Sequence, residues 1–190
     1  MKNLAYISLM ICFLSQISYG QTYNIKSGAL EILAVAPLDT VSAISEKLVG
    51  SLNKKTKRIS FSCAIESFIF EDQLILTNLS RTILNVKEHP TINFEGEYRI
   101  SRKEREAKDN SRFIIINGVL TLNGVPQKLS VETILIENKE RVNVSFKTII
   151  DLNDHKVSIP SLLRDALSNE IEISLDIDLI PASNHKSKER

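Results

Sequence analysis

Gly118-Val-Leu-Thr-Leu-Asn-Gly-Val-Pro-Gln-Lys-Leu-Ser-Val131 is the stretch of sequence that decides the fold. Apolar and polar residues alternate up to Asn123-Gly124, and the alternation resumes after Pro126. An Asn-Gly pair accepts the positive φ angles of a two-residue hairpin turn, and alternation is typical of strands with one buried face. The stretch therefore predicts a β-hairpin with strands over residues 113–122 and 128–137.

The same alternation on both sides of this hairpin predicts six more strands. Residues 41–52 also fit helical spacing, but the polar turn at 53–56 and the clean alternation after it favour a strand. Eight antiparallel strands in up-and-down order can close into a barrel that holds packed side chains or one small ligand. We therefore expect an all-β, eight-stranded antiparallel closed barrel. The predicted strands span residues 23–35, 41–52, 57–67, 91–101, 113–122, 128–137, 141–151 and 170–180.

Two connections between these strands are predicted to be helical. Apolar residues recur every three to four positions from Asp72 to Val86. His89-Pro90 ends that segment, because a residue before proline is pushed out of the helical region. In the second connection, from Asp151 to Asn169, Pro160 can begin a short helix over residues 161–167. We expect two short helical connections in the barrel.

The first twenty residues have the pattern of a secretory signal peptide. Lys2 supplies a positive charge, residues 4–13 are mostly apolar, and Ser18-Tyr19-Gly20 is a small-x-small cleavage site. The apolar run is shorter than the roughly 20 residues that a membrane-spanning helix needs. We expect residues 1–20 to be removed, leaving a periplasmic or secreted protein without an integral membrane span. Residues 21–182 would form one barrel domain, and residues 183–190 a disordered polar tail.

The charge balance of the chain argues against nucleic acid as a partner. The 190 residues contain 24 Lys and Arg against 23 Asp and Glu, and removal of residues 1–20 takes away only Lys2 among them. A nearly neutral chain has no electrostatic footprint for nucleic acid or for an anionic membrane surface. Cys63 is the one cysteine after residue 20, so no internal disulfide can form and the core must stabilise the domain. Its place in an apolar alternation predicts a small buried side chain.

No pattern in the sequence favours catalysis or a metal site. His89, His155 and His185 form no His-x-His or His-x-x-x-His pair, and Cys63 is the only soft ligand beyond the signal. Asp154-His155 is not accompanied by a serine in a nucleophile-elbow context. We expect a protein that is not an enzyme and that has no cofactor other than an apolar lipid ligand.

The strand alternation predicts an apolar barrel interior, which suits a lipid tail because an uncharged lining cannot stabilise a charged ligand. Inward glycines at Gly96 and Gly118 either leave room for a ligand or meet the bends that barrel closure requires. A hollow barrel and a barrel packed by Phe61, Phe94 and Phe146 both stay open. The residues expected to line a lipid site are Phe61, Ile65, Phe94, Gly96, Tyr98, Ile116, Gly118, Leu120, Val131 and Phe146.

Several segments of the chain together resemble the YceI-like proteins. The hairpin reads Gly-x-Leu-Thr-x-x-Gly-Val followed by Lys, which is similar to the central motif of that family. His89-Pro-Thr-Ile-Asn-Phe-Glu-Gly96 is similar to the family's stretch of an aromatic residue, Pro, two residues, an aliphatic residue, Phe and a small residue. Residues 57–70 and 154–160 resemble segments of variants from flavobacteria-like organisms. The resemblance covers residues 22–182.

The resemblance implies a lipocalin-like β-barrel of the bacterial cell envelope, a family in which several members hold a polyisoprenoid lipid. Two segments depart from the family pattern. Ser27-Gly-Ala-Leu-Glu-Ile32 stands where many members have a His-Ser pair, and Thr77-Asn-Leu79 stands where a Glu-His-Phe motif is common. We expect a non-catalytic carrier of an isoprenoid or fatty-acid-like lipid. The alternative is a packed structural or protein-interaction barrel without lipid, and a homodimer also stays open.

Overall fold

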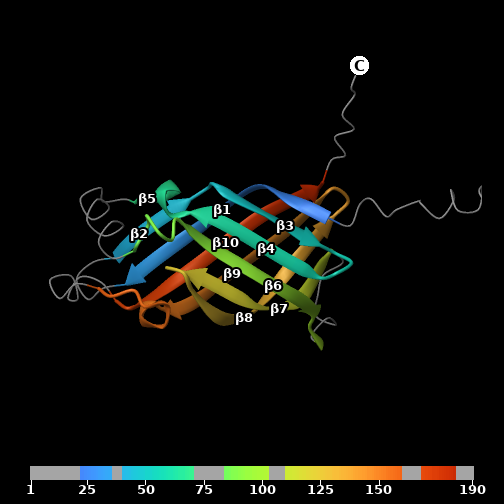
Figure 1. Ribbon diagram of the computed structural model, residues 1–190. Helices are drawn as coiled ribbons and strands as arrows, with labels where there is room; N and C mark the ends of the chain where they lie inside the picture. Colours follow the sequence, from blue (N-terminus) through green and yellow to red (C-terminus); the bar gives the residue numbers. More distant parts are fainter. Residues whose placement is uncertain (1–21, 36–39, 71–83, 103–109, 160–167, 183–190) are drawn as a thin grey trace, which may run out of the picture.

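Ten antiparallel strands form one sheet that closes on itself in the part of the chain that the computed structural model describes (Figure 1). The described residues are 22–35, 40–70, 84–102, 110–159 and 168–182, so the predicted signal peptide and polar tail lie outside them. The strands are β1 (Thr22–Val35), β2 (Thr40–Ser45), β3 (Leu48–Asn53), β4 (Arg58–Ala64), β5 (Ile69–Phe70), β6 (Thr91–Ile100), β7 (Ser111–Leu122), β8 (Val125–Asn138), β9 (Arg141–Asp151) and β10 (Glu170–Pro181).

The ring of the barrel has eight positions, which confirms the predicted closed up-and-down architecture. Neighbouring strands follow the chain order from β1 to β10, and β10 pairs with β1 to close the ring. Strands β2 and β3 share one position, because both pair with β1 in the same register, with Leu30 opposite Ser45 and Thr22 opposite Asn53. They are the two halves of the strand predicted over residues 41–52. Strand β5 pairs with the other edge of β2, as β4 pairs with the other edge of β3, so β4 and β5 share a second position and the ten strands occupy eight.

The central hairpin has the predicted two-residue turn. Asn123 and Gly124 have φ angles of 51° and 72°, and Leu122 pairs with Val125 directly across the turn. Strand β8 begins before Lys128, because Pro126 is accommodated opposite Thr121 at the start of the strand, where a missing N–H is tolerated.

The two predicted helical connections are only weakly matched. The described helical segments are two short 3-10 turns, η1 (Ile65–Ser67) and η3 (Leu152–His155). Residues 72–83 of the first predicted helical segment and residues 161–167 of the second lie outside the described residues, and residues 84–86, at the end of the first segment, are not helical. Turn η1 also shortens the strand predicted over residues 57–67. The Ser67 hydroxyl donates a hydrogen bond to the Ala64 carbonyl at 2.6 Å, and such local side-chain bonds compete with strand pairing.

Side chains alternate between a buried interior and the outer surface along every long strand. On β10, the residues Ile171, Ile173, Leu175, Ile177 and Leu179 are each at most 5% exposed. A β-bulge between Ile25 and Ser27 on β1 shifts the inward set from Tyr23 to the even-numbered residues that follow, including Leu30. Cys63 is 1% exposed on β4, as its apolar alternation predicts.

Candidate ligand-binding site

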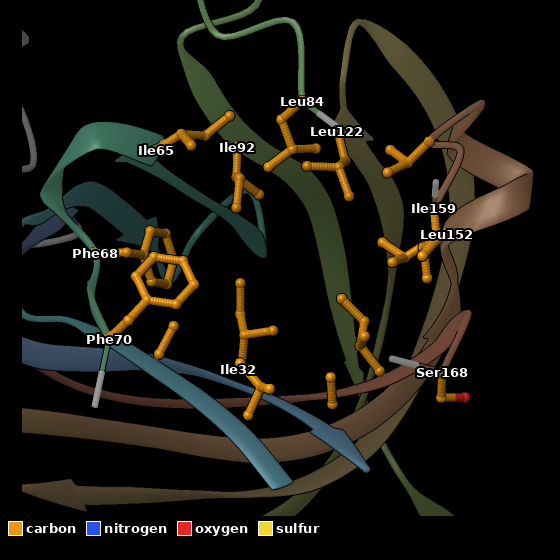
Figure 2. A pocket seen from close by; sticks show the side chains of 15 residues that line it. Ile32, Ile65, Phe68, Phe70, Leu84, Ile92, Leu122, Leu152, Ile159 and Ser168 are labelled. Atoms are coloured by element: carbon orange, nitrogen blue, oxygen red, sulfur yellow. The ribbon is translucent and has the colours of Figure 1, made fainter. Parts of the chain in front are cut away.

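An apolar pocket lies at the end of the barrel where β2, β5 and η3 are found (Figures 1 and 2). We call it the end pocket, and its volume is about 130 Å³. Ser168 is the one polar residue among the described residues that line it. The lining consists of Ile32, Ala34, Val41, Ala43, Ile65, Phe68, Phe70, Leu84, Ile92, Leu122, Leu152, Val157, Ile159, Ser168 and Ile171.

One wall of the end pocket is built from η1 and β5. The Ser45 and Ser67 hydroxyl groups lie 2.6 Å apart, which ties η1 to the end of β2. Ala43 then pairs with Phe70, so that β5 runs along β2. Figure 2 shows the rings of Phe68 and Phe70 next to each other on this side of the pocket, across from Leu152 and Ile159. This wall supplies the aromatic part of the lining.

The opposite wall is held by the turn of the central hairpin. Asn123 accepts a hydrogen bond from the Asn85 N–H at 3.3 Å and donates from its side-chain amide to the carbonyls of His155 and Lys156, each at 3.4 Å. The Gln127 amide donates to the Asp154 carbonyl at 2.7 Å. One turn therefore fixes both connections that bring Leu84, Leu152 and Val157 to the pocket.

Two histidines complete the contacts around the turn. His155 is 1% exposed, and its Nδ1 lies 3.0 Å from the Val125 carbonyl oxygen. The His89 ring covers Gly124, where an added Cβ would lie 2.4 Å from the ring carbon Cε1. A Cβ at position 124 would therefore be strained by the positive φ angle and would require the His89 ring to shift.

The middle of the barrel, behind the end pocket, is filled by aromatic rings. Phe61 and Phe94 stack with their centroids 5.3 Å apart and their planes at 17°. The Cζ atom of Phe94 lies 2.9 Å and 2.5 Å from where Cβ atoms would stand on Gly96 and Gly118. The two inward glycines make room for this ring. Two of the three rings that the packed option requires are therefore in contact at this level.

The structure separates the ten residues predicted to line a lipid site. Ile65 lies in the end pocket. Phe61, Phe94, Gly96 and Gly118 form the packed middle described above. The other five, Tyr98, Ile116, Leu120, Val131 and Phe146, are also buried in the interior, each at most 7% exposed. Their part in ligand binding stays a prediction.

Sequence reasoning missed most of the end pocket. The inward alternation of β1 could have identified Ile32 and Ala34. No periodic signal marks Leu152, Val157 and Ile159, which belong to an irregular connection. Their direction depends on hydrogen bonds to the hairpin turn, which no local pattern encodes.

The far end of the barrel has different chemistry. The Lys54 ammonium donates to the Tyr23 hydroxyl at 2.9 Å and to the Glu137 carboxylate, and it lies 4.2 Å from the centre of the Tyr23 ring. Burial by itself lowers the pKa of Lys54, but the hydrogen bonds to Glu137 and Tyr23 outweigh it and raise this pKa above its ordinary value. Burial raises the pKa of Tyr98. This end is charged and hydrogen-bonded, whereas the end pocket is apolar.

The described residues contain no group of three or more His, Cys, Asp or Glu side chains that could hold a metal ion. Within the same ranges, no helix has both the length and the apolar character needed to cross a bilayer. The arrangement that remains is a cavity whose lining can bury apolar groups of a ligand.

The fold and the site define the class of closed up-and-down β-barrels with an apolar pocket at one end. Within that class, the chain belongs to the YceI-like domain family, whose model matches residues 27–179. This match confirms the resemblance seen in the sequence motifs.

Solved structures with the same fold are distant in sequence. A polyisoprenoid binding domain from Saccharophagus degradans, implicated in plant cell wall breakdown, has a TM-score of 0.72 at 10% identity over 84% of this chain and 98% of that chain. BcnA from Burkholderia cenocepacia has a TM-score of 0.62 at 12% identity, over 80% and 95%. A YceI protein from Campylobacter jejuni has a TM-score of 0.54 at 17% identity, over 88% of each chain. A search of curated proteins gives no match.

Proposed function

We propose that this protein is a non-catalytic carrier that binds an apolar lipid, isoprenoid or fatty-acid-like, in the end pocket. The observation that carries the proposal is the lining, in which Ser168 is the one polar residue among those described. Such a lining gains free energy by removing apolar surface from water, at about 25 cal/mol per Å², and offers nothing to a charged group. A lipid therefore binds with its apolar end inside and its polar group towards solvent.

The comparisons support the same class of ligand. The Saccharophagus domain is described as polyisoprenoid binding, and it shares the fold of this chain. The packed-barrel alternative predicts an interior filled by Phe61, Phe94 and Phe146 with no cavity. The stack of Phe61 and Phe94 agrees with that alternative only in the middle of the barrel, because the end pocket is a cavity.

The proposed site of action is the periplasm or the exterior of the cell. The support is the signal-peptide pattern of residues 1–20. When the full chain is expressed in a bacterium, we expect the extracytoplasmic fraction to contain a protein whose first residue is Gln21, as read by intact-mass spectrometry. A cytoplasmic product that retains residues 1–20 would contradict this location, but it would not contradict the proposed lipid binding.

Ligand binding is tested by native mass spectrometry of the protein purified from bacteria, followed by organic extraction. The Ala43→Phe variant places a ring in the end pocket, because Ala43 is 4% exposed and lines it. The Ala64→Phe variant is the matched control, because Ala64 is exposed on β4. We expect an extractable apolar ligand on the wild type and on Ala64→Phe, and none on Ala43→Phe.

A wild-type protein that is empty after purification and stays empty after incubation with farnesol or palmitate would overturn the carrier proposal. Equal ligand loading of Ala43→Phe and Ala64→Phe would place the ligand somewhere other than the end pocket. Circular dichroism of both variants establishes that they are folded before they are compared.

A further inference from the structure

The end pocket is closed on its inner side by a set of side chains that we call the floor. These side chains come from the next inward-facing position along the strands after the residues that line the pocket. Ile92 on β6 and Leu122 on β7 line the pocket. The next inward residue on β6 is Phe94, which lies opposite Phe61 on β4 and opposite Leu120 on β7. On this side of the barrel, the stacked rings of Phe61 and Phe94 therefore come directly after the lining of the end pocket.

The ring of Phe94 is directed away from the pocket, over the glycine pair. Gly96 and Gly118 lie opposite each other on β6 and β7, and both approach Phe94 Cζ too closely to accept a Cβ. Phe94 is 2% exposed and Phe61 is 4% exposed, so the stack is closed to solvent. The space above the two glycines, which a long ligand would need in order to continue through the barrel, is occupied by a side chain of the protein itself.

The volume in front of this floor is small. A cavity of about 150 Å³ is known to hold one benzene molecule, and the end pocket has about 130 Å³. It is therefore large enough for about five or six carbon atoms, which corresponds to one isoprene unit or the last carbons of an acyl chain. The remainder of any longer ligand has to lie outside the pocket.

We infer that Phe94, supported by Phe61, is the residue that determines ligand length in this protein, so that the site takes the terminal five or six carbons of an apolar chain and not the whole chain. The inference rests on the proposed lipid-binding function and specifies its ligand. The ligand class is an amphiphile with a short apolar terminus that is buried and a longer or polar remainder that stays at the rim.

The test is a series of straight-chain primary alcohols from four to twelve carbons, whose binding to the full-length protein is measured by NMR titration. Each buried methylene should strengthen binding about fourfold up to about six carbons, and each further methylene less than twofold. In Phe94→Ala the fourfold increments should continue for several more carbons, because the ring that closes the space above Gly96 and Gly118 is gone. Phe94→Leu removes less side-chain volume, so the fourfold increments should continue for fewer additional carbons. This variant replaces Phe94→Ala in the test if Phe94→Ala does not fold.

Ile116→Ala is the matched control. Ile116 is 1% exposed and lies beyond the glycine pair, opposite Tyr98, so this variant also opens space in the core but on the far side of the Phe94 ring. Its length dependence should be that of the wild type.

Two results overturn the assignment in different ways. If no alcohol of any length binds the wild type, the lipid-binding function fails and the length limit fails with it. If alcohols bind but each methylene up to twelve carbons strengthens binding fourfold in the wild type, the function stands and the role of Phe94 is wrong. The same conclusion follows if the fourfold increments still end at six carbons in Phe94→Ala and Phe94→Leu. If the chain length at which the fourfold increments end rises as much in Ile116→Ala as in Phe94→Ala, this result also contradicts a floor made by Phe94.

Discussion

The Nδ1 atom of His155 lies 3.0 Å from the carbonyl oxygen of Val125, and the histidine that makes this contact is 1% exposed. Val125 is the first residue of β8 and follows the Asn123-Gly124 turn directly. The contact therefore joins the irregular connection after β9 to the start of the second strand of the central hairpin. It is a buried polar contact at the edge of an apolar pocket, where an unsatisfied group would be costly.

Replacement of His155 by Leu tests the strength of this contact. The Val125 carbonyl would lose its imidazole partner in a buried place, so we expect the free energy of unfolding to fall by about 1–3 kcal/mol. Urea denaturation followed by circular dichroism measures the change. Asp154→Ala is the matched control, since Asp154 is exposed and its backbone carbonyl, which accepts from Gln127, is retained. Equal stability of His155→Leu and Asp154→Ala would show that the contact does not stabilise the fold.

Gly124 can be tested by a double-mutant cycle with His89. Gly124→Ala should destabilise the protein by about 2–4 kcal/mol, because it combines a Cβ at positive φ with overpacking against the His89 ring. In a His89→Ala background the steric part disappears, and the cost should fall to about 1–2 kcal/mol. Denaturant unfolding of the four proteins gives the coupling between the two positions. A coupling of zero would contradict the packing of His89 on Gly124.

Lys54 and Tyr98 predict a loss of stability at alkaline pH. For Lys54, burial lowers the pKa but hydrogen bonds to Glu137 and Tyr23 raise it above the ordinary 10.5, and for Tyr98 burial raises the pKa above the ordinary 10.0. The folded state therefore holds both protons more tightly than the unfolded state does. The resulting stabilisation is fully present below pH 10 and is lost as the pH rises through the two folded-state pKa values.

The measurement is the free energy of unfolding as a function of pH up to and above pH 10. We expect it to decline above pH 10 in the wild type and to decline less in Lys54→Met and in Tyr98→Phe. Lys147→Met is the control, because the Lys147 ion pair with Glu172 at 2.8 Å involves a side chain that is 67% exposed, and solvent screens such pairs. An alkaline decline that is identical in Lys54→Met and the wild type would exclude this role for Lys54.

The barrel could be predicted from the sequence because the information that specifies it is local. Most long strands alternate without interruption, β1 alternates on either side of its bulge, and Asn123-Gly124 encodes its own turn. The strand predicted over residues 41–52 is interrupted at Glu46-Lys47, but the prediction still places it correctly because both halves keep one register against β1. Register and alternation together place the buried residues on the correct face.

The end pocket could not be predicted in the same way, because its walls depend on contacts between residues far apart in the chain. Ser45 orients η1 through Ser67, and Asn123 orients η3 through the carbonyl of His155. The sequence also leaves open whether the middle of the barrel is hollow or packed. Gly96 and Gly118 are compatible with both, and the direction of the Phe94 side chain decides between them.

Cys63 offers a chemical measurement of how the end pocket opens. Its sulfur lies 3.6 Å from the Ser67 hydroxyl, and it is 1% exposed behind η1, whose Ile65 lines the pocket. We expect a thiol reagent to reach the sulfur when η1 moves away, and this movement also removes a wall of the pocket. Ligand at a hundred times its dissociation constant should therefore slow labelling of Cys63 by about 100-fold.

The experiment uses the full chain with Cys12→Ser, so that Cys63 is the only thiol, and intact-mass spectrometry follows the labelling by N-ethylmaleimide with and without 1-hexanol. The control is Ser145→Cys in a Cys12→Ser, Cys63→Ala background, because residue 145 is exposed on the outer face of β9. Its labelling rate should not respond to the ligand. If 1-hexanol binds and Cys63 is labelled at the same rate as before, then η1 opens without releasing the ligand, and the wall formed by Ile65 and Phe68 does not close the site.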